Sequence, residues 1–214
     1  MLKLEFHCHT NASKDSLTKP EDLIKTAKRK GLDRLVITDH NSIQGALAAQ
    51  KLDRELVIVG EEIMTTRGEI LAAYVQEEIP AGLTPQETIK ILKEQGAFIS
   101  VSHPFDRLRK GGWEENDLLE IIEQVDAIEI FNARCMNPMF NVQAKQFAEK
   151  YNLAGTVGSD AHAAFEVGRS VILLDQFTGP EEMRKVIRQA KYQTKLSSWL
   201  VHFVSRYASM KNRS

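Results

Sequence analysis

Two histidines stand one residue apart near the start of the chain, in the stretch HCHTNASKDS. Successive side chains of a β-strand point to opposite faces, so His7 and His9 share one face while Cys8 points the other way. A strand can thus offer two imidazole nitrogens to one metal ion. Because a chance pair is common in a chain with six histidines, the pair predicts a metal site only where other ligands meet it.

Further acidic, imidazole and amide residues come at the ends of later apolar runs, namely Asp39, His40, Glu61, Glu62, His103, Asn132, Asp160 and His162. Five of the six histidines lie at such ends. Asp, Glu and His without cysteine indicate a hydrolytic site for Zn, Mn or Fe, and more than four ligands indicate more than one ion. Two ions that share a carboxylate suit in-line displacement at phosphorus.

Short apolar runs alternate with helical periodicity along the chain, which predicts parallel strands joined by crossover helices. We expect strands over 2–6, 34–38, 55–60, 68–75, 97–102, 127–131, 153–158 and 169–174, and helices over 20–31, 43–51, 84–96, 115–124, 139–151 and 180–190. About seven strand–helix units make a small α/β barrel. The carboxyl ends of parallel barrel strands converge on one face, so the polar residues are expected to meet there.

Length and composition fit one domain with a large core, since the chain has 214 residues, 43% hydrophobic and 27% charged. A net charge of −1 provides no general basic field, so stable binding of duplex nucleic acid is not expected. No apolar run approaches the roughly 20 residues of a membrane span. Two cysteines form no disulfide framework and the N-terminus lacks a signal-peptide pattern, so we expect a cytoplasmic enzyme.

The motifs HCHTNASKDS, TDHNS, GEEI, SHPFD and GSDAH resemble, in this order, those of the PHP family of polymerase and histidinol phosphatase domains. The resemblance implies a distorted, seven-stranded, TIM-like β/α barrel of PHP type with two or three divalent ions. It implies one ion held by His7, His9, Glu62 and Asp160, a second by Glu62 and His103, and a third by Asp15, His40 and His162. Glu62 would then bridge ions, and the expected catalytic residues are His7, His9, Glu62, His103, Asp160 and Arg134.

Several positions leave alternatives open. Glu69 stands where many relatives carry a histidine, and it is either a replacement ligand or a solvated hairpin residue. Asn132 stands where some carry another histidine, so the second ion is expected to be more weakly held. Strand alternation points Glu61 away from Glu62, and Asp39 is a positioning or helix-capping residue rather than a ligand. His202 lies in a helical pattern away from the strand ends, and no role is expected for it.

Arginines beyond two of these strand ends could bind a phosphate, because a planar guanidinium matches phosphate oxygens. Arg107 and Arg109 follow His103, while Arg134 follows Asn132 by two residues. Each of them could instead be an ordinary solvated charge. We expect Arg134 to be the main phosphate contact, with Arg107, Arg109 and Asn132 as further substrate-binding residues.

The end of the chain repeats apolar residues at helical spacing between Leu196 and Met210. We divide the chain into a PHP-like metallohydrolase barrel over 1–195 and an amphipathic helix and tail over 196–214. The apolar face of this helix is expected to pack on the same domain rather than on a partner or a membrane surface.

These features predict a metal-dependent phosphoesterase in which a metal-bound hydroxide attacks phosphorus. Its expected substrates are small phosphomonoesters or phosphodiester ends, in nucleotides or short oligonucleotides. Two alternatives stay open, which are a histidinol-phosphate phosphatase and a metal-binding regulatory module without turnover.

Overall fold

Strands and helices alternate along the chain in the order that the apolar periodicity predicts. The computed structural model describes residues 1–212. Its strands are β1 (Leu2–Glu5), β2 (Arg34–Ile37), β3 (Val57–Met64), β4 (Glu69–Ala73), β5 (Phe98–Val101), β6 (Ala127–Asn132), β7 (Ala154–Gly158), β8 (Ser170–Leu174) and β9 (Lys191–Thr194). Its helices are α1 (Pro20–Arg29), α2 (Gln44–Leu52), α3 (Pro85–Glu94), α4 (Glu115–Leu119), α5 (Pro138–Lys150), α6 (Pro180–Val186) and α7 (Val201–Lys211), with short 3-10 turns η1 (Ala164–Glu166) and η2 (Ile187–Gln189).

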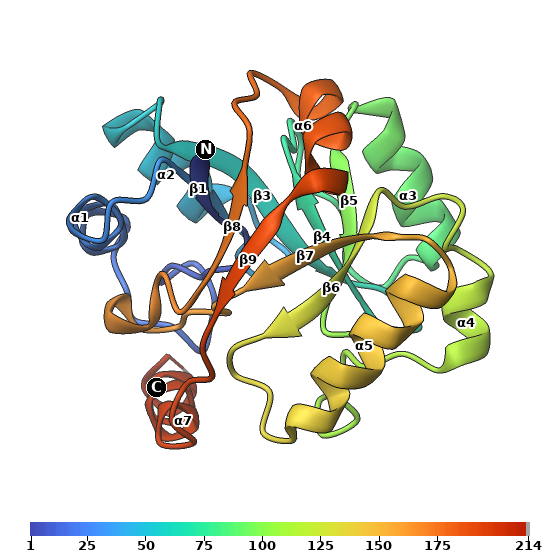
Figure 1. Ribbon diagram of the computed structural model, residues 1–214. Coiled ribbons are helices and arrows are strands. Elements are labelled where there is room, and N and C mark those ends of the chain that lie inside the picture. The colour runs from blue at the N-terminus through green and yellow to red at the C-terminus, as the bar shows by residue number, and fades with distance from the viewer. Residues whose placement is uncertain (213–214) are drawn as a thin grey trace.

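The strands form one sheet in the order β7-β6-β5-β4-β3-β2-β1-β8-β9. Neighbours pair in parallel within β1-β2-β3 and within β5-β6-β7, whereas β4, β8 and β9 run antiparallel to their neighbours. The sheet curls into a nearly closed barrel (Figure 1). Its two edges meet where the Tyr192 hydroxyl of β9 donates a hydrogen bond of 3.0 Å to the Gly155 carbonyl of β7.

The expected count of seven strands is wrong, because the described residues contain nine. The α/β barrel itself is confirmed. β9 escaped prediction since it is an edge strand of sequence KYQT whose side chains are mostly exposed, so it has no apolar run. The helix expected over 115–124 is also shorter, since α4 ends at Leu119 and gives way to turns.

Local signals in the sequence explain where α3 begins and ends. The Thr84 side chain accepts a hydrogen bond from the Glu87 amide, and the Glu87 carboxylate accepts one from the Thr84 amide, so both halves of a capping box are present. Pro85 occupies the first turn, where its missing N–H costs nothing. Gly96 follows the helix with a φ of +73°, a conformation that favours glycine.

Two apolar clusters hold the strands in place. One packs the sheet against the buried faces of the surrounding helices, including Leu23 and Leu92. The other joins residues from β1 through β8 with α6. It includes the rings of Phe6 and Phe98, which meet edge to face with their centroids 5.7 Å apart. Figure 1 shows α6 and α7 at opposite ends of the barrel. The second cluster therefore fills the end of the barrel that α6 covers, opposite to α7 (Figure 1).

The C-terminal helix α7 contacts the barrel with part of its surface. It begins at Val201 and buries Val201 and Ala208, while Phe203 and Tyr207 are both 59% exposed. Much of its apolar stripe therefore faces outward, and polar contacts described below join it to the barrel. The boundary at 195–196 stays a prediction, and residues 213–214 of the expected tail lie outside the described part.

Within the described residues, no helix combines the length and the apolar character needed to cross a membrane.

Candidate metal centre

His7 and His9 lie just past the end of β1, and their imidazole rings converge. The Nδ1 atom of His7 lies 3.0 Å from the Glu129 carboxylate. The Nδ1 atom of His9 lies 3.2 Å from the Ser13 hydroxyl, which itself donates to Asp39 at 2.6 Å. Each Nδ1 therefore carries the hydrogen of its ring, and both Nε2 atoms are the free positions. This confirms that the two histidines share a face.

The two Nε2 atoms lie 3.1 Å apart, so at most one of them can carry a hydrogen. Burial, the largest influence, lowers the pKa of His9 to about 3, which keeps this ring neutral with an unshared electron pair at Nε2. A proton or a metal ion must then lie between the two rings to make this approach favourable. The geometry is that of two imidazole ligands of one ion.

Two carboxylates complete this group. One oxygen of Glu62 lies 3.3 Å from His7 Nε2 and 3.5 Å from His9 Nε2, and one oxygen of Asp160 lies 3.6 and 3.3 Å from the same atoms. Both oxygens are buried without a hydrogen-bond partner among the described residues. Burial alone would raise the pKa of both carboxyls, but positive charge facing them outweighs it and each pKa lies well below its usual value. Such orphaned, ionised oxygens fit metal ligands.

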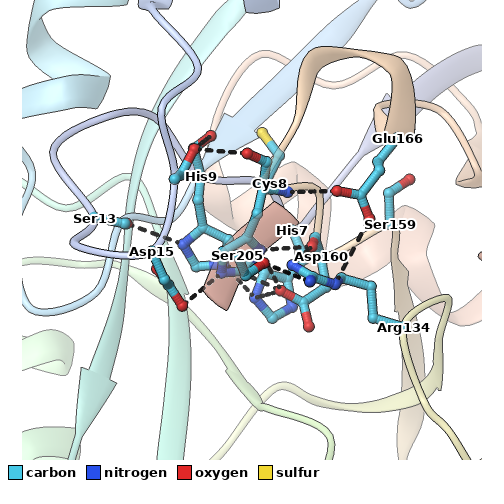
Figure 2. A network of polar contacts seen from close by, with 12 residues as sticks. His7, Cys8, His9, Ser13, Asp15, Arg134, Ser159, Asp160, Glu166 and Ser205 are labelled. Atoms are coloured by element: carbon cyan, nitrogen blue, oxygen red, sulfur yellow. Dashed lines mark hydrogen bonds and ion pairs between the residues drawn. The ribbon is translucent and has the colours of Figure 1, made fainter. Parts of the chain in front are cut away.

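A second group lies beside the first. The Nδ1 atom of His162 donates to the Asp160 carbonyl at 2.9 Å, so its Nε2 faces the Asp15 carboxylate at 3.0 Å. His40 Nε2 lies 3.5 Å from the same carboxylate oxygen. Ligand atoms of His9, His40 and His162 all lie within 4.8 Å of one another. Figure 2 shows Asp15 reaching toward the cluster from the loop that follows His9.

A third group contains His103 and Glu69 around the other oxygen of Glu62. His103 Nε2 lies 3.1 Å from Glu62 and 3.4 Å from Glu69. Glu69 is only 6% exposed and also lies 3.6 Å from His40 Nδ1, so it is not a solvated hairpin residue. Glu62 faces all three groups with its two oxygens, which is the arrangement that a bridging carboxylate needs.

The backbone around Asp160 is shaped for this site. Asp160 has a φ of +50°, a left-handed conformation that Asp tolerates better than most residues. Just before it, Gly158 lets β7 approach β1 closely, since a Cβ there would lie 2.3 Å from the Cβ of His7. The strained residue and the glycine together bring the Asp160 carboxylate beside the two imidazoles.

Residues outside the ligand groups hold the ligands in position. Asp39 accepts hydrogen bonds from the Thr10 amide and hydroxyl and from Ser13, which agrees with a positioning role. Asn132 donates to Glu129 at 3.1 Å and to Asp160 at 3.2 Å. Glu61 points away from the site, where it accepts a hydrogen bond from the Ile79 amide.

The prediction from sequence overlooked Glu129 and the site's contact with His202. Glu129 contacts His7 and accepts a hydrogen bond of 2.8 Å from the His103 amide. In the sequence, Glu129 is noticeable only as a single acidic residue inside the apolar run AIEIF. An irregularity between Glu129 and Phe131 lets both Glu129 and Asn132 face the site.

A cavity of about 250 Å³ lies over the metal-ligand groups. Its lining residues are Asp15, His40, Met64, Glu69, Arg109, Lys110, Gly111, Arg134, His162, His202 and Ser205. The expectation that His202 lies away from the strand ends is thus wrong. The helical pattern placed it correctly on α7, but α7 folds back over the carboxyl ends of the strands.

The three arginines lie in different surroundings. Arg109 lines the cavity and its Nη1 atom donates to Asp160 at 2.5 Å. Arg134 is 4% exposed, and its Nη2 atom donates to Ser205 at 2.5 Å and to the Val201 carbonyl at 3.2 Å. Arg107 is exposed and lines a separate hollow with Phe105 and Lys150. Arg109 therefore has the most direct contact with the ligand cluster.

The barrel and this cluster define a PHP-type protein with a site fitted to divalent ions. A family model described as the PHP domain matches residues 5–110, and one described as PHP-associated matches residues 138–192. The chain belongs to the PHP family.

Similar sequences cover most of the chain. An uncharacterized protein of Methanocaldococcus jannaschii is 38% identical over 145 residues, covering 62% of this chain and 82% of that protein. Another uncharacterized protein from the same organism is 37% identical over 174 residues, covering 80% of this chain and 70% of that protein. A protein of Caldicellulosiruptor bescii described as a probable phosphatase is 25% identical over 217 residues, covering 85% and 90%.

Similar solved structures show the same fold. A two-domain protein of Bacteroides vulgatus, described as containing a predicted PHP-like metal-dependent phosphoesterase, has a TM-score of 0.74 at 21% identity. The match covers 91% of this chain and 65% of the Bacteroides chain, so the present chain spans about two thirds of it. A lesion-specific endonuclease of Pyrococcus furiosus has a TM-score of 0.58 at 17% identity, over 89% of this chain and 57% of that one.

Proposed function

We propose that the protein is a metal-dependent phosphoesterase that hydrolyses phosphomonoesters or phosphodiester ends, in nucleotides or short oligonucleotides. The observation that carries this proposal is that three groups of possible metal ligands overlap. His9, His40 and Glu62 each belong to two of these groups. Buried carboxylate oxygens without hydrogen-bond partners lie at the centre of these groups. The description of a relative as a probable phosphatase supports the same reaction class.

The donor set fits two or three divalent ions of the Mn, Zn or Fe type, because its ligands are imidazoles and carboxylates only. His7, His9, Glu62 and Asp160 would hold one ion. Glu62, His103 and Glu69 would hold a second, and Asp15, His40 and His162 a third. Such ions supply an activated water and neutralise phosphate charge.

The protein's own residues would fix the ligands and the phosphate. Glu129 holds the His7 ring through Nδ1, and the Ser13–Asp39 pair holds the His9 ring, so both Nε2 atoms stay turned to the site. Arg109 contacts Asp160 and Asp106 through Nη1 and Nε, and no hydrogen bond joins its Nη2 to another residue within 1–212. We propose Arg109 as the main phosphate-binding arginine.

Arg134 has a different proposed role from the one expected from sequence. Its Nη1 and Nη2 atoms donate to Asp160, Val201 and Ser205 of the protein itself. A guanidinium with these donors occupied is a positioning group for the cavity wall. Arg107 faces another hollow, so we propose no role for it at the phosphate.

A substrate panel tests this function. Purified protein is supplied in turn with Mn, Zn, Fe and Mg, and release of inorganic phosphate is measured from nucleotides, phosphorylated oligonucleotide ends, simple alkyl phosphates and histidinol phosphate. Release from the first three classes supports the proposal. Activity confined to histidinol phosphate would assign the alternative phosphatase, and no release with any metal would favour a metal-binding module without turnover.

A further inference from the structure

The cavity over the metal-ligand groups has one wall that α7 supplies. His202 and Ser205 are the two residues of α7 that line it, while Asp15, His40 and His162 line the side formed by the ligand groups. The two family models match residues up to 192, so α7 (Val201–Lys211) lies beyond both. The chain thus closes its cavity with a segment that the family models do not describe.

Arg134 fastens this wall to the metal centre. Its Nη2 atom donates to the Ser205 hydroxyl and the Val201 carbonyl, and its Nη1 atom donates to the Asp160 carbonyl at 3.4 Å. Figure 2 shows the Arg134 side chain extending between Ser205 and Asp160. Because Arg134 is almost fully buried, these contacts set the position of α7 relative to the ligands.

The hydrogen bonds within the wall determine what it offers to a bound molecule. His202 Nε2 lies 3.1 Å from the Arg134 carbonyl, which can only accept, so Nε2 carries the hydrogen and Nδ1 remains available. Burial, helped by the charge of Arg134, lowers the pKa of His202, so Nδ1 of the neutral ring is an acceptor. The Ser205 oxygen accepts from Arg134 and keeps its own hydrogen to donate.

We propose that His202 and Ser205 recognise a hydroxyl group on the alcohol part of a small phosphomonoester. A hydroxyl both donates and accepts, so an acceptor and a donor on neighbouring turns of one helix are complementary to it. The cavity volume of about 250 Å³ lies below the range of most ligand pockets, roughly 300–1,000 Å³, which favours a small substrate. This inference rests on the proposed phosphoesterase function and names its substrate class.

Two alkyl phosphates of similar size test the inference, namely glycerol phosphate, which carries free hydroxyls, and propyl phosphate, which carries none. His202→Phe keeps a ring of similar size but removes the Nδ1 acceptor together with the Nε2 donor, and Ser205→Ala removes the hydroxyl donor. Tyr207→Ala, on the exposed side of α7, is the matched control.

The wild-type protein should prefer glycerol phosphate over propyl phosphate by roughly ten-fold in kcat/KM, the value of one well-made hydrogen bond. Each of the two variants should lose this preference, because its KM should rise more for glycerol phosphate than for propyl phosphate. Tyr207→Ala should keep the preference. A merely structural role would instead alter the kinetics of both substrates by the same factor.

The possible failures can be told apart. Phosphate release from both compounds at equal kcat/KM, or a preference that survives in both variants, would overturn the hydroxyl-recognising wall and leave the phosphoesterase proposal standing. Absence of phosphate release from these compounds and from the whole panel, with every metal, would instead contradict the proposed function on which the inference rests.

Discussion

His7 and His9 bring their Nε2 atoms to within 3.1 Å of each other, while each Nδ1 atom is held by a separate hydrogen-bond partner. Two nitrogens at this distance need a proton or a metal ion between them. Glu129 on one ring and Ser13 on the other fix the two imidazoles so that both Nε2 atoms face this shared position. Such orienting partners are what metal-binding histidines need, which explains why these side chains are committed to holding two rings.

Replacing Asp160 should abolish hydrolysis without unfolding the protein. Asp160→Asn suits the left-handed backbone at this position, since Asn tolerates it as Asp does, but the variant loses the ionised oxygen that faces both imidazoles. We expect kcat/KM to fall at least about a hundred-fold with a near-native circular dichroism spectrum. Asp175→Asn, an exposed carboxylate after β8, should behave as wild type. Activity retained in Asp160→Asn would remove Asp160 from the site.

Glu129 should control metal affinity without itself being a ligand. Glu129→Gln keeps the size of the side chain but weakens its hold on His7 Nδ1 and on the His103 amide. Loss of such an orienting partner typically costs 10- to 100-fold in metal affinity. Chelator competition with Mn or Zn measures this effect, and Glu123→Gln on the surface is the control. Equal affinities in both variants would show that the His7 ring needs no such partner.

Replacing Arg109 should lower catalytic efficiency, because we propose it as the main phosphate-binding arginine. Arg109→Ala removes the guanidinium beside Asp160, and a charged hydrogen bond of about 1.5–3 kcal/mol corresponds to a ten- to hundred-fold loss in kcat/KM. Arg109→Lys should recover only part, because it lacks the planar fork. Arg54→Ala, an exposed arginine before β3, should have no effect. Wild-type kinetics in Arg109→Ala would return attention to Arg134.

Glu61 should make the protein less stable as the pH rises. Burial, the largest influence, raises the pKa of this carboxyl from 4.5 to about 8, so between these values the native state holds a proton that the unfolded state has lost. The free energy of unfolding must then fall across that pH window. The side chain introduced by Glu61→Gln stays neutral at every pH. As the pH rises, the free energy of unfolding of this variant should therefore increase relative to that of the wild type by about 1 kcal/mol per pH unit.

Urea unfolding at several pH values, in the presence of a chelator to remove metal, measures this difference. Glu77→Gln, an exposed carboxylate nearby, should follow the wild-type curve. Parallel curves for wild type and Glu61→Gln between pH 5 and 8 would show that Glu61 is ionised in the native state.

The sequence predicted those parts of the site that depend on local periodicity. Alternation along the first strand placed His7 and His9 on one face, and the carboxyl ends of parallel strands brought His40, His103 and Asp160 to them. These relationships follow from the pleat of a strand and the topology of a barrel. They need no knowledge of long-range packing.

Features that depend on long-range packing could not be predicted in this way. In the sequence, Glu129 is one charged residue in an apolar run. Its side chain faces His7 because β6 pairs with β7 and has an irregularity between Glu129 and Phe131. His202 lies 40 residues beyond His162 along the sequence, yet the turn before α7 returns it to the same cavity. β9 has no apolar pattern, because its pairing with β8 is made by the backbone at an exposed edge.

The most direct test of the metal-centre account is a titration of chelator-treated protein with Mn, in which ion binding and phosphate release are followed together. We expect no hydrolysis before addition, at least two ions bound per chain, and recovery of activity in step with binding. Because the imidazole ligands must lose their protons, occupancy should fall as the pH drops through the histidine range. Binding of one ion or none, or hydrolysis that persists unchanged after chelation, would contradict the account.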